Sequence, residues 1–301
     1  MTIEVLPRSE RRDHPTLGIV TFIGNLILMV LISAMVKTMS VSYPLSELLL
    51  LRFVFAMLFF WVILLSTGGV RGLATKRLWD HGFRSASGIT SLALFYYAIS
   101  EIPMADATAL TYSAPIFITF LSIFLLRETI GIQRWIAVIA GFVGVLLIAQ
   151  PGGSGWNAGI VAGIASAVTG ALVAIWLRRL SSSEKSVTIG IYYNTSGTLV
   201  CLVWALLSGW ILPQGSDFIL LLVFGLMCGA QQWLLTISFR YAEASLLAPF
   251  EYVTMIFAAF AGYYFWDEIP VSTTWLGAGV IAASGIYIFL RRQKIRKVKE
   301  T

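Results

Sequence analysis

The sequence predicts an all-α integral membrane protein with ten transmembrane helices in two inverted five-helix repeats. Of its 301 residues, 58% are hydrophobic and 12% are charged, and the mean hydropathy is +0.84. Soluble domains contain about 45–50% apolar and about 25% charged residues, so this composition is typical of a membrane protein. The apolar residues fall into ten runs, and the second five runs repeat the pattern of the first five.

Each predicted helix follows from one apolar run of about 20 residues, the length that crosses a hydrocarbon core of about 30 Å. The runs lie at residues 17–36, 45–66, 83–100, 105–126, 132–149, 157–177, 187–209, 217–238, 244–266 and 273–290. The connectors between them are too short to hold a soluble domain. A transmembrane β-barrel is excluded, because runs such as Val54–Leu65 do not alternate between apolar and polar residues.

Residues suited to metal or covalent chemistry are few. Cys201 and Cys228 lie within apolar runs, and His14 and His81 stand alone in polar segments. We therefore expect no disulfide framework, no metal site and no cofactor. The sequence contains no Walker A motif and no cluster of histidines and carboxylates at a shared depth, so we expect that the protein is not an enzyme.

The basic residues predict the orientation in the membrane. Nineteen of the 21 lysines and arginines lie in the two terminal segments or in and beside the even-numbered connectors; the exceptions are Lys37 and Arg52. Because basic connectors remain in the cytoplasm, we expect a multi-pass protein of the cell inner membrane with both termini cytoplasmic. The net charge of +6 then reflects topology and contact with anionic lipids, and no nucleic-acid partner is expected.

An internal repeat becomes visible when the sequence is shifted by 140 residues. The shift superposes identical residues, among them Leu94 on Leu234, Tyr112 on Tyr252, Glu128 on Glu268 and Trp135 on Trp275. Each copy holds five spans, an odd number, so the second copy enters the membrane from the opposite face. The predicted organisation is a cytoplasmic amino-terminal tail at 1–16, repeats at 17–150 and 157–290, and a basic cytoplasmic tail at 291–301.

Motifs in both copies resemble the EamA family of the drug/metabolite transporter superfamily. They are Ala248-Pro249-Phe250-Glu251-Tyr252 and Asp267-Glu268 in the second copy, Tyr112-Ser113-Ala114-Pro115 and Arg127-Glu128 in the first, and Leu51-Arg52-Phe53 in the second span. The resemblance implies a bundle around a central cavity, lined by helices 1, 3, 4, 6, 8 and 9, and export of small metabolites. Within the family, the chain most resembles the amino-acid exporters of the YddG type.

Two spans carry polar faces suited to binding a solute. Thr108, Thr111 and Tyr112 share one face of span 4, and Glu251 with Tyr252 occupies the matching face of span 9. Polar groups that face lipid are costly, so these side chains are expected to face inward. The alternative is that the hydroxyls only bond to neighbouring helices.

Other uncharged polar residues complete the predicted lining. They are Asn25 on span 1, Tyr96 and Tyr97 on span 3, and Gln231, Gln232 and Trp233 on span 8. Amides and phenols suit a zwitterionic or moderately polar solute held between apolar walls. For Trp233 the alternative is ordinary packing.

Charged residues inside the spans are rare. Glu251 is the sharpest candidate, because an ionisable group at that depth is a functional hypothesis by default. It could exchange protons during transport, or it could pair with a helix terminus or with Arg240. Arg52 is expected to satisfy carbonyl groups or to pair with Glu47. Glu268 lies at the end of a span, where we expect it to be solvated or to cap the next turn.

Small residues and prolines predict close packing or hinges. Gly159 and Gly163 lie along span 6 and Gly262 lies on span 9, and such residues let helix backbones approach closely. Pro115 and Pro249 could kink or hinge spans 4 and 9.

These observations predict a secondary transporter that exports small metabolites, with amino acids as the favoured class, by alternating access. Its expected partners are the solute and membrane lipids, with no obligate protein partner. The alternatives are a multidrug exporter of lipophilic cations and, in other classes, a membrane receptor or a membrane enzyme. Span 1 contains Asn25 and no acidic residue, which counts against cation antiport.

Overall fold

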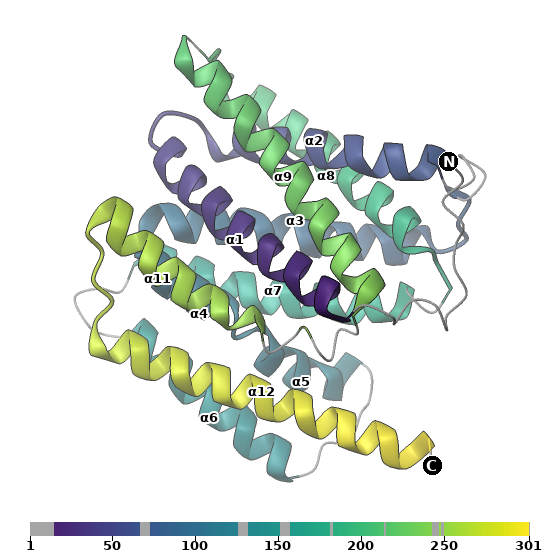
Figure 1. Cartoon of the computed structure of the whole chain (residues 1–301), viewed down its shortest axis with the longest axis vertical. Coiled ribbons are helices and arrows are strands. Elements are labelled where there is room, and N and C mark those ends of the chain that lie inside the picture. Colours follow the sequence, from purple (N-terminus) through teal and green to yellow (C-terminus); the bar gives the residue numbers. More distant parts are fainter. Residues whose placement is uncertain are drawn as a thin grey trace. The chain divides into compact units, whose positions relative to one another are not determined.

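The computed structural model describes residues 15–66, 73–125, 132–150, 157–180, 183–213, 215–242, 247 and 250–300. These residues form helices and connecting turns and contain no β-strand, as the composition predicts (Figure 1). The helices are α1 (Pro15–Met39), α2 (Leu45–Ser66), α3 (Leu78–Glu101), α4 (Met104–Thr111), α5 (Ala114–Leu125), α6 (Ile132–Ala149), α7 (Ala158–Leu180), α8 (Ser186–Ser208), α9 (Ser216–Tyr241), α11 (Val253–Trp266) and α12 (Ser272–Glu300).

The helices fit the ten predicted spans. Among the described residues, six segments are long and apolar enough to cross a membrane: Thr16–Met39, Leu45–Leu65, Met104–Leu121, Ala158–Leu177, Val187–Ser208 and Ser216–Leu235. Shorter apolar segments are Trp135–Ala149, Val253–Trp266 and Ser272–Ile288. The more polar α3 accounts for the remaining span. Span 4 differs from the expected continuous helix, because it is built from α4 and α5. The backbone of α12 continues as a helix to Glu300, through most of the predicted tail at 291–301.

Large apolar side chains are exposed on the outside of these helices. On α8, Val203, Leu206 and Leu207 are 57%, 68% and 82% exposed. Extended apolar surface of this kind is unfavourable in water and favourable in lipid. The exposure pattern therefore agrees with a membrane protein.

The chain forms two compact units, and each contains helices from both halves of the sequence. Unit 1 comprises Met1–Ile89 and Trp176–Leu247, and unit 2 comprises Thr90–Ile175 and Ala248–Thr301. Unit 1 contains α1, α2, α8 and α9, and unit 2 contains α4, α5, α6, α11 and α12. The compact units therefore do not coincide with the sequence repeats.

In unit 1, the second helix of each repeat packs antiparallel to its equivalent. Glu47, near the start of α2, accepts a hydrogen bond from the backbone N–H of Ile211, just beyond the end of α8 (3.3 Å). At the other end, the Tyr192 hydroxyl of α8 donates to the Leu73 carbonyl, which follows α2 (3.0 Å). Equivalent helices that run in opposite directions are what an inverted repeat requires.

Aromatic rings of α2 lie against glycines of α8 and α9. At four positions a Cβ on the glycine would collide with a phenylalanine ring: Gly190 with Phe60, Gly197 with Phe53, Gly225 with Phe55 and Gly229 with Phe59. Small residues at helix contacts allow close packing, which is a main source of stability where lipid replaces water. These contacts hold α2 between the two other helices.

In unit 2, α6 and α12 are the fifth helices of the two repeats and approach each other at glycines. A Cβ on Gly144 would lie 2.8 Å from the Gly277 carbonyl oxygen, and a Cβ on Gly277 would lie 2.6 Å from that of Gly144. The Ser284 hydroxyl donates to the Ala137 carbonyl (2.5 Å). Ser284 corresponds to Gly144 and Ala137 to Gly277 at the 140-residue shift. The two contacts are therefore symmetry-related.

We expect that Gly197→Ala destabilises the protein by about 1–3 kcal/mol, because the added methyl group overpacks against Phe53. The free energy of unfolding, measured by reversible denaturation in mixed micelles, checks this. Gly82→Ala is the matched control, since no atom lies within 4 Å of a Cβ at that position of α3. Equal stability of the two variants would contradict the packing role.

Candidate functional site

The fourth span of the chain is interrupted in the middle. Helix α4 ends at Thr111 and α5 begins at Ala114, with Tyr112 and Ser113 between them. In the second repeat, Tyr252 directly precedes α11 as its N-cap. The two tyrosines are equivalent at the 140-residue shift. Interrupted helices at corresponding positions of two repeats are the strongest pointer to a solute site in secondary transporters.

Pro115 explains the interruption in the first repeat. Proline has no N–H to donate, so the Thr111 carbonyl loses its usual helical partner. The chain tightens instead: Ser113 N–H donates to the Leu110 carbonyl (3.1 Å), and Ile116 N–H donates to that of Ser113 (2.9 Å). Pro249 of the second repeat lies outside the described residues.

The equivalent tyrosines meet within unit 2. The ring centroids of Tyr112 and Tyr252 are 6.5 Å apart with an interplanar angle of 53°. Gly285 of α12 makes room for the Tyr252 hydroxyl, which a Cβ would displace. Glu251 is partly buried, and its carboxylate interacts electrostatically with both tyrosines. Two phenols and one carboxylate thus lie together at the helix breaks.

Two threonines add hydroxyl groups to this pair. Thr111 Oγ1 is buried and has no hydrogen-bond partner in the described chain. Thr254 of α11 lies beside Tyr112. We name Thr111, Tyr112, Glu251, Tyr252 and Thr254 the tyrosine site.

The other candidates of unit 2 make the following contacts. Tyr96 is 1% exposed and packs with Phe95 at 6.4 Å between centroids. Tyr97 is partly buried, and its carbonyl accepts from Ser100 (2.8 Å). The Thr108 hydroxyl donates to the Met104 carbonyl of its own helix (2.7 Å). The hydroxyl of Thr108 therefore serves its own helix.

In unit 1, two predicted residues bind each other. Gln231 Nε2 donates to Asn25 Oδ1 (2.7 Å), and both side chains are buried. The remaining oxygen, Gln231 Oε1, has no partner in the described chain. Gln232 is partly buried, and Trp233 packs against Phe59 of α2 at 6.5 Å between centroids. The sequence predicted each amide separately but not their pairing.

The expected ion pair between Arg52 and Glu47 does not form. Glu47 Oε2 accepts from the Ile211 backbone, and Oε1 has no partner among the described residues. Arg52 instead lies beside the thiol of Cys228 on α9. The backbone N–H of Ile211, which follows α8, satisfies one oxygen of the Glu47 carboxylate in place of Arg52.

Glu268 caps a distant helix rather than the turn that follows it. Its Oε2 accepts from the Met104 backbone N–H at the start of α4 (2.9 Å). The N-cap of α4 is Pro103, which has no side-chain acceptor. The first N–H groups of a helix need such acceptors, so Glu268 holds the start of the helix that ends at the tyrosine site.

The small residues singled out by the sequence lie at close contacts in unit 2. A Cβ on Gly159 would lie 2.6 Å from Glu101 Cβ, one on Gly163 3.1 Å from Leu110 Cδ1, and one on Gly262 2.9 Å from Glu268 Oε2. Substitution at any of these positions would displace neighbouring atoms.

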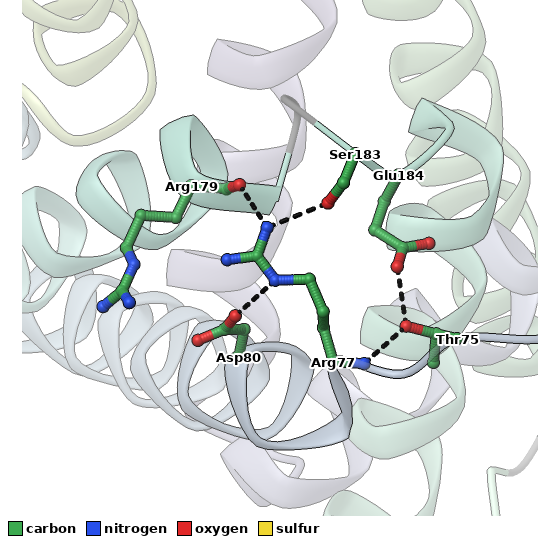
Figure 2. Close-up of polar contacts among 6 residues, drawn as sticks. All are labelled: Thr75, Arg77, Asp80, Arg179, Ser183 and Glu184. Carbon is green, nitrogen blue, oxygen red and sulfur yellow. Dashed lines mark hydrogen bonds and ion pairs between the residues drawn. The ribbon is translucent and has the colours of Figure 1, made fainter.

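A polar cluster ties the connectors at one end of unit 1 (Figure 2). Arg77 Nε binds Asp80 Oδ2 (2.7 Å), and its Nη1 donates to the Arg179 carbonyl and the Ser183 hydroxyl (both 2.8 Å). The Thr75 hydroxyl donates to Glu184 Oε1 (2.7 Å). We name these residues the connector cluster. From the sequence, Arg77 and Arg179 were used only to predict the orientation in the membrane.

Sequence reasoning also missed the buried polar face of α3 formed by His81, Arg84 and Ser85. Their spacing was the available signal, because residues i, i+3 and i+4 share one face of a helix. Among the described residues, no group of three or more histidines, cysteines or acidic residues could hold a metal ion.

Comparisons with known proteins agree with this architecture. The model of the EamA-like transporter family matches residues 16–150 and again 157–291. A riboflavin transporter of Vibrio cholerae is 25% identical over 92% of this chain and 94% of its own. An S-adenosylmethionine uptake transporter of Rickettsia bellii is 26% identical over 77% and 79%, and the pseudopaline exporter CntI of Pseudomonas aeruginosa strain UCBPP-PA14 is 29% identical over 84% and 89%.

One solved crystal structure shares the fold. It has a TM-score of 0.61 and 16% sequence identity, and the match covers 92% of this chain and 96% of that chain. At this identity the likeness concerns the fold alone.

We expect that Glu268→Ala lowers the free energy of unfolding by about 1–2 kcal/mol, because α4 loses a charge-assisted cap. Glu268→Gln should lose less, since its carbonyl oxygen still accepts a hydrogen bond. Thermal unfolding of the purified protein compares the two variants. A Glu268→Ala protein as stable as the unaltered one would contradict the capping role.

Proposed function

The chain belongs to the EamA-like transporter family, and we propose that it exports small metabolites, with amino acids as the favoured class, by alternating access. Members of this family are transporters of small molecules, so the protein is a membrane transporter and not an enzyme. The observation that carries the proposal is the pair of helix breaks at Tyr112 and Tyr252, whose rings meet in unit 2. Backbone freed at such breaks can bind a solute and can move between two states.

The residues of the tyrosine site favour an amino-acid-sized solute with a positive group. The Glu251 carboxylate is suited to an ammonium group, and the faces of two tyrosines attract cations. In unit 1, Gln231 Oε1 is a separate acceptor with no partner in the described chain. We propose all eleven of the following as binding residues: Asn25, Tyr96, Tyr97, Thr108, Thr111, Tyr112, Gln231, Gln232, Trp233, Glu251 and Tyr252.

The proposed direction, export, rests on the resemblance of the sequence motifs to the EamA family. The names of the relatives include both an uptake transporter and an exporter. We place the protein in the inner membrane with both termini cytoplasmic, on the distribution of its basic residues. The two repeats are proposed at 17–150 and 157–290.

A multidrug exporter of lipophilic cations is the second candidate. One carboxylate beside two aromatic rings is a chemistry that also suits such a cation. An amino acid differs because it brings its own carboxylate, which needs hydrogen-bond donors that a lipophilic cation does not need. Transport of a quaternary ammonium compound with no competition by amino acids would favour the second candidate.

We expect that cysteines placed at Tyr112, Gln232 and Tyr252 react with a water-soluble thiol reagent and are protected by the solute. The background is Cys201→Ala/Cys228→Ala, which removes two buried thiols. Phe260→Cys is the control: Phe260 is 68% exposed on the apolar helix α11, where we expect lipid, so this cysteine should stay unlabelled with or without the solute. Unlabelled cysteines at the first three positions would argue against the site.

We expect that Glu251→Gln abolishes the response of transport to an imposed pH gradient and preserves solute exchange. Glutamine keeps the size and hydrogen bonding of the side chain but does not exchange a proton. Uptake into proteoliposomes, with and without a pH gradient, measures both properties. Glu101→Gln, at the exposed end of α3, is the control. If the unaltered protein transports without any pH dependence, Glu251 is structural and the carrier is a facilitator.

A further inference from the structure

The first turns of α3 carry polar atoms for which the described chain provides no partner. His81, Arg84 and Ser85 lie on one helix face, and His81 and Ser85 are 2% and 3% exposed. Both ring nitrogens of His81, Nε and Nη1 of Arg84, and Oγ of Ser85 are buried without a hydrogen bond in this part of the chain. Buried polar groups of native proteins are almost always satisfied, so five such atoms on one face require an explanation.

Aromatic rings of α8 hold the side chains of His81 and Arg84 in place. The His81 ring stacks on Tyr192 with 4.4 Å between centroids, and the Arg84 guanidinium lies 3.8 Å from the centroid of Tyr193. Gly88 leaves space beside the guanidinium, since a Cβ there would lie 3.1 Å from Nη1. These contacts orient both groups. Arg84 also has a side-chain hydrogen bond with Tyr193, while its Nε and Nη1 have no acceptor in the described chain.

The acidic residues nearest this face are engaged in the connector cluster. Asp80 accepts from Arg77, and Glu184 accepts from the Thr75 hydroxyl (Figure 2). Arg84 makes no ion pair with a carboxylate of the described chain. A positive charge and several polar atoms therefore lie together where the described part of the chain supplies no paired anion.

We propose that this face of α3 binds an oxyanion, the carboxylate, phosphate or sulfate group of a solute or of a lipid headgroup, between Arg84, His81 and Ser85. Hydrogen bonds from charged donors to oxyanions are among the strongest available in proteins. The site is distinct from the tyrosine site and does not depend on the proposed function.

Proton uptake should accompany binding. His81 lies outside the predicted span at 83–100, and burial lowers the pKa of its ring. The acids Glu184 and Asp80 partly oppose this shift, and Arg84 and Arg77 reinforce it. The ring is therefore neutral at neutral pH when the site is empty. A bound oxyanion favours the protonated ring, so binding should strengthen as the pH falls.

Thermal unfolding of the full-length protein in phosphatidylcholine nanodiscs tests the proposal, with inorganic sulfate as the probe and chloride at equal ionic strength as the reference. Sulfate keeps its charge from about pH 6 to about pH 8, so any pH dependence belongs to the protein. We expect sulfate to raise the Tm, more strongly at the lower pH. Arg84→Gln should lose this shift, and His81→Gln should lose its pH dependence. Arg179→Gln, which removes an exposed arginine near the connector cluster, should keep both.

A second arm distinguishes the sources of the anion. Nanodiscs that contain phosphatidylglycerol, without sulfate, should raise the Tm of the unaltered protein over that of Arg84→Gln if a lipid headgroup is the ligand. A shift with sulfate alone assigns the site to a free solute. No shift in either arm, or an Arg84→Gln protein that responds like the unaltered one, overturns the proposal. If Arg84→Gln does not fold, Ser85→Ala and His81→Gln decide: full sulfate shifts in both overturn it.

Discussion

The structure depends on the close antiparallel contact between equivalent helices of the two repeats. Gly144 and Gly277 let the backbones of α6 and α12 meet, and the symmetry-related pair, Ser284 and Ala137, forms a hydrogen bond. In lipid, helices gain little from hydrophobic burial, so close packing and such bonds carry the association. Because each contact joins the two halves, each compact unit contains helices from both repeats.

The same symmetry explains why the tyrosine site forms. Residues related by the 140-residue shift meet only where their two helices approach the symmetry axis, and Tyr112 and Tyr252 lie at such a place. The symmetry is incomplete where chemistry is expected, because Thr111 occupies the position that corresponds to Glu251. The tyrosine site therefore has one carboxylate. A symmetric pair of acids would place two carboxylates close together, and these would repel each other.

Sequence patterns predicted the ten spans, the repeat and the tyrosine pair, because all three depend on local composition or on fixed spacing. They predicted a kink or hinge of span 4 at Pro115, but not that the helix ends at Thr111 and begins again at Ala114. They also missed the cap that Glu268 provides to α4 and the bond between Asn25 and Gln231. Each of these joins residues more than 160 positions apart, and only the packed fold determines which distant groups meet.

Two classes of polar side chain in the helices help to separate structural residues from candidates for binding. In the first class a hydroxyl donates to a carbonyl of its own helix, as Ser33, Thr108 and Thr169 do. Such a bond satisfies the donor without any neighbour, so these residues are stable in lipid and need no ligand. In the second class, atoms of Thr111, Gln231 and the polar face of α3 are buried without a partner in the described chain. An unsatisfied group costs most where water is absent. A ligand that binds such an atom in part of the transport cycle would remove this cost, so we expect solutes, protons and anions to act at the second class.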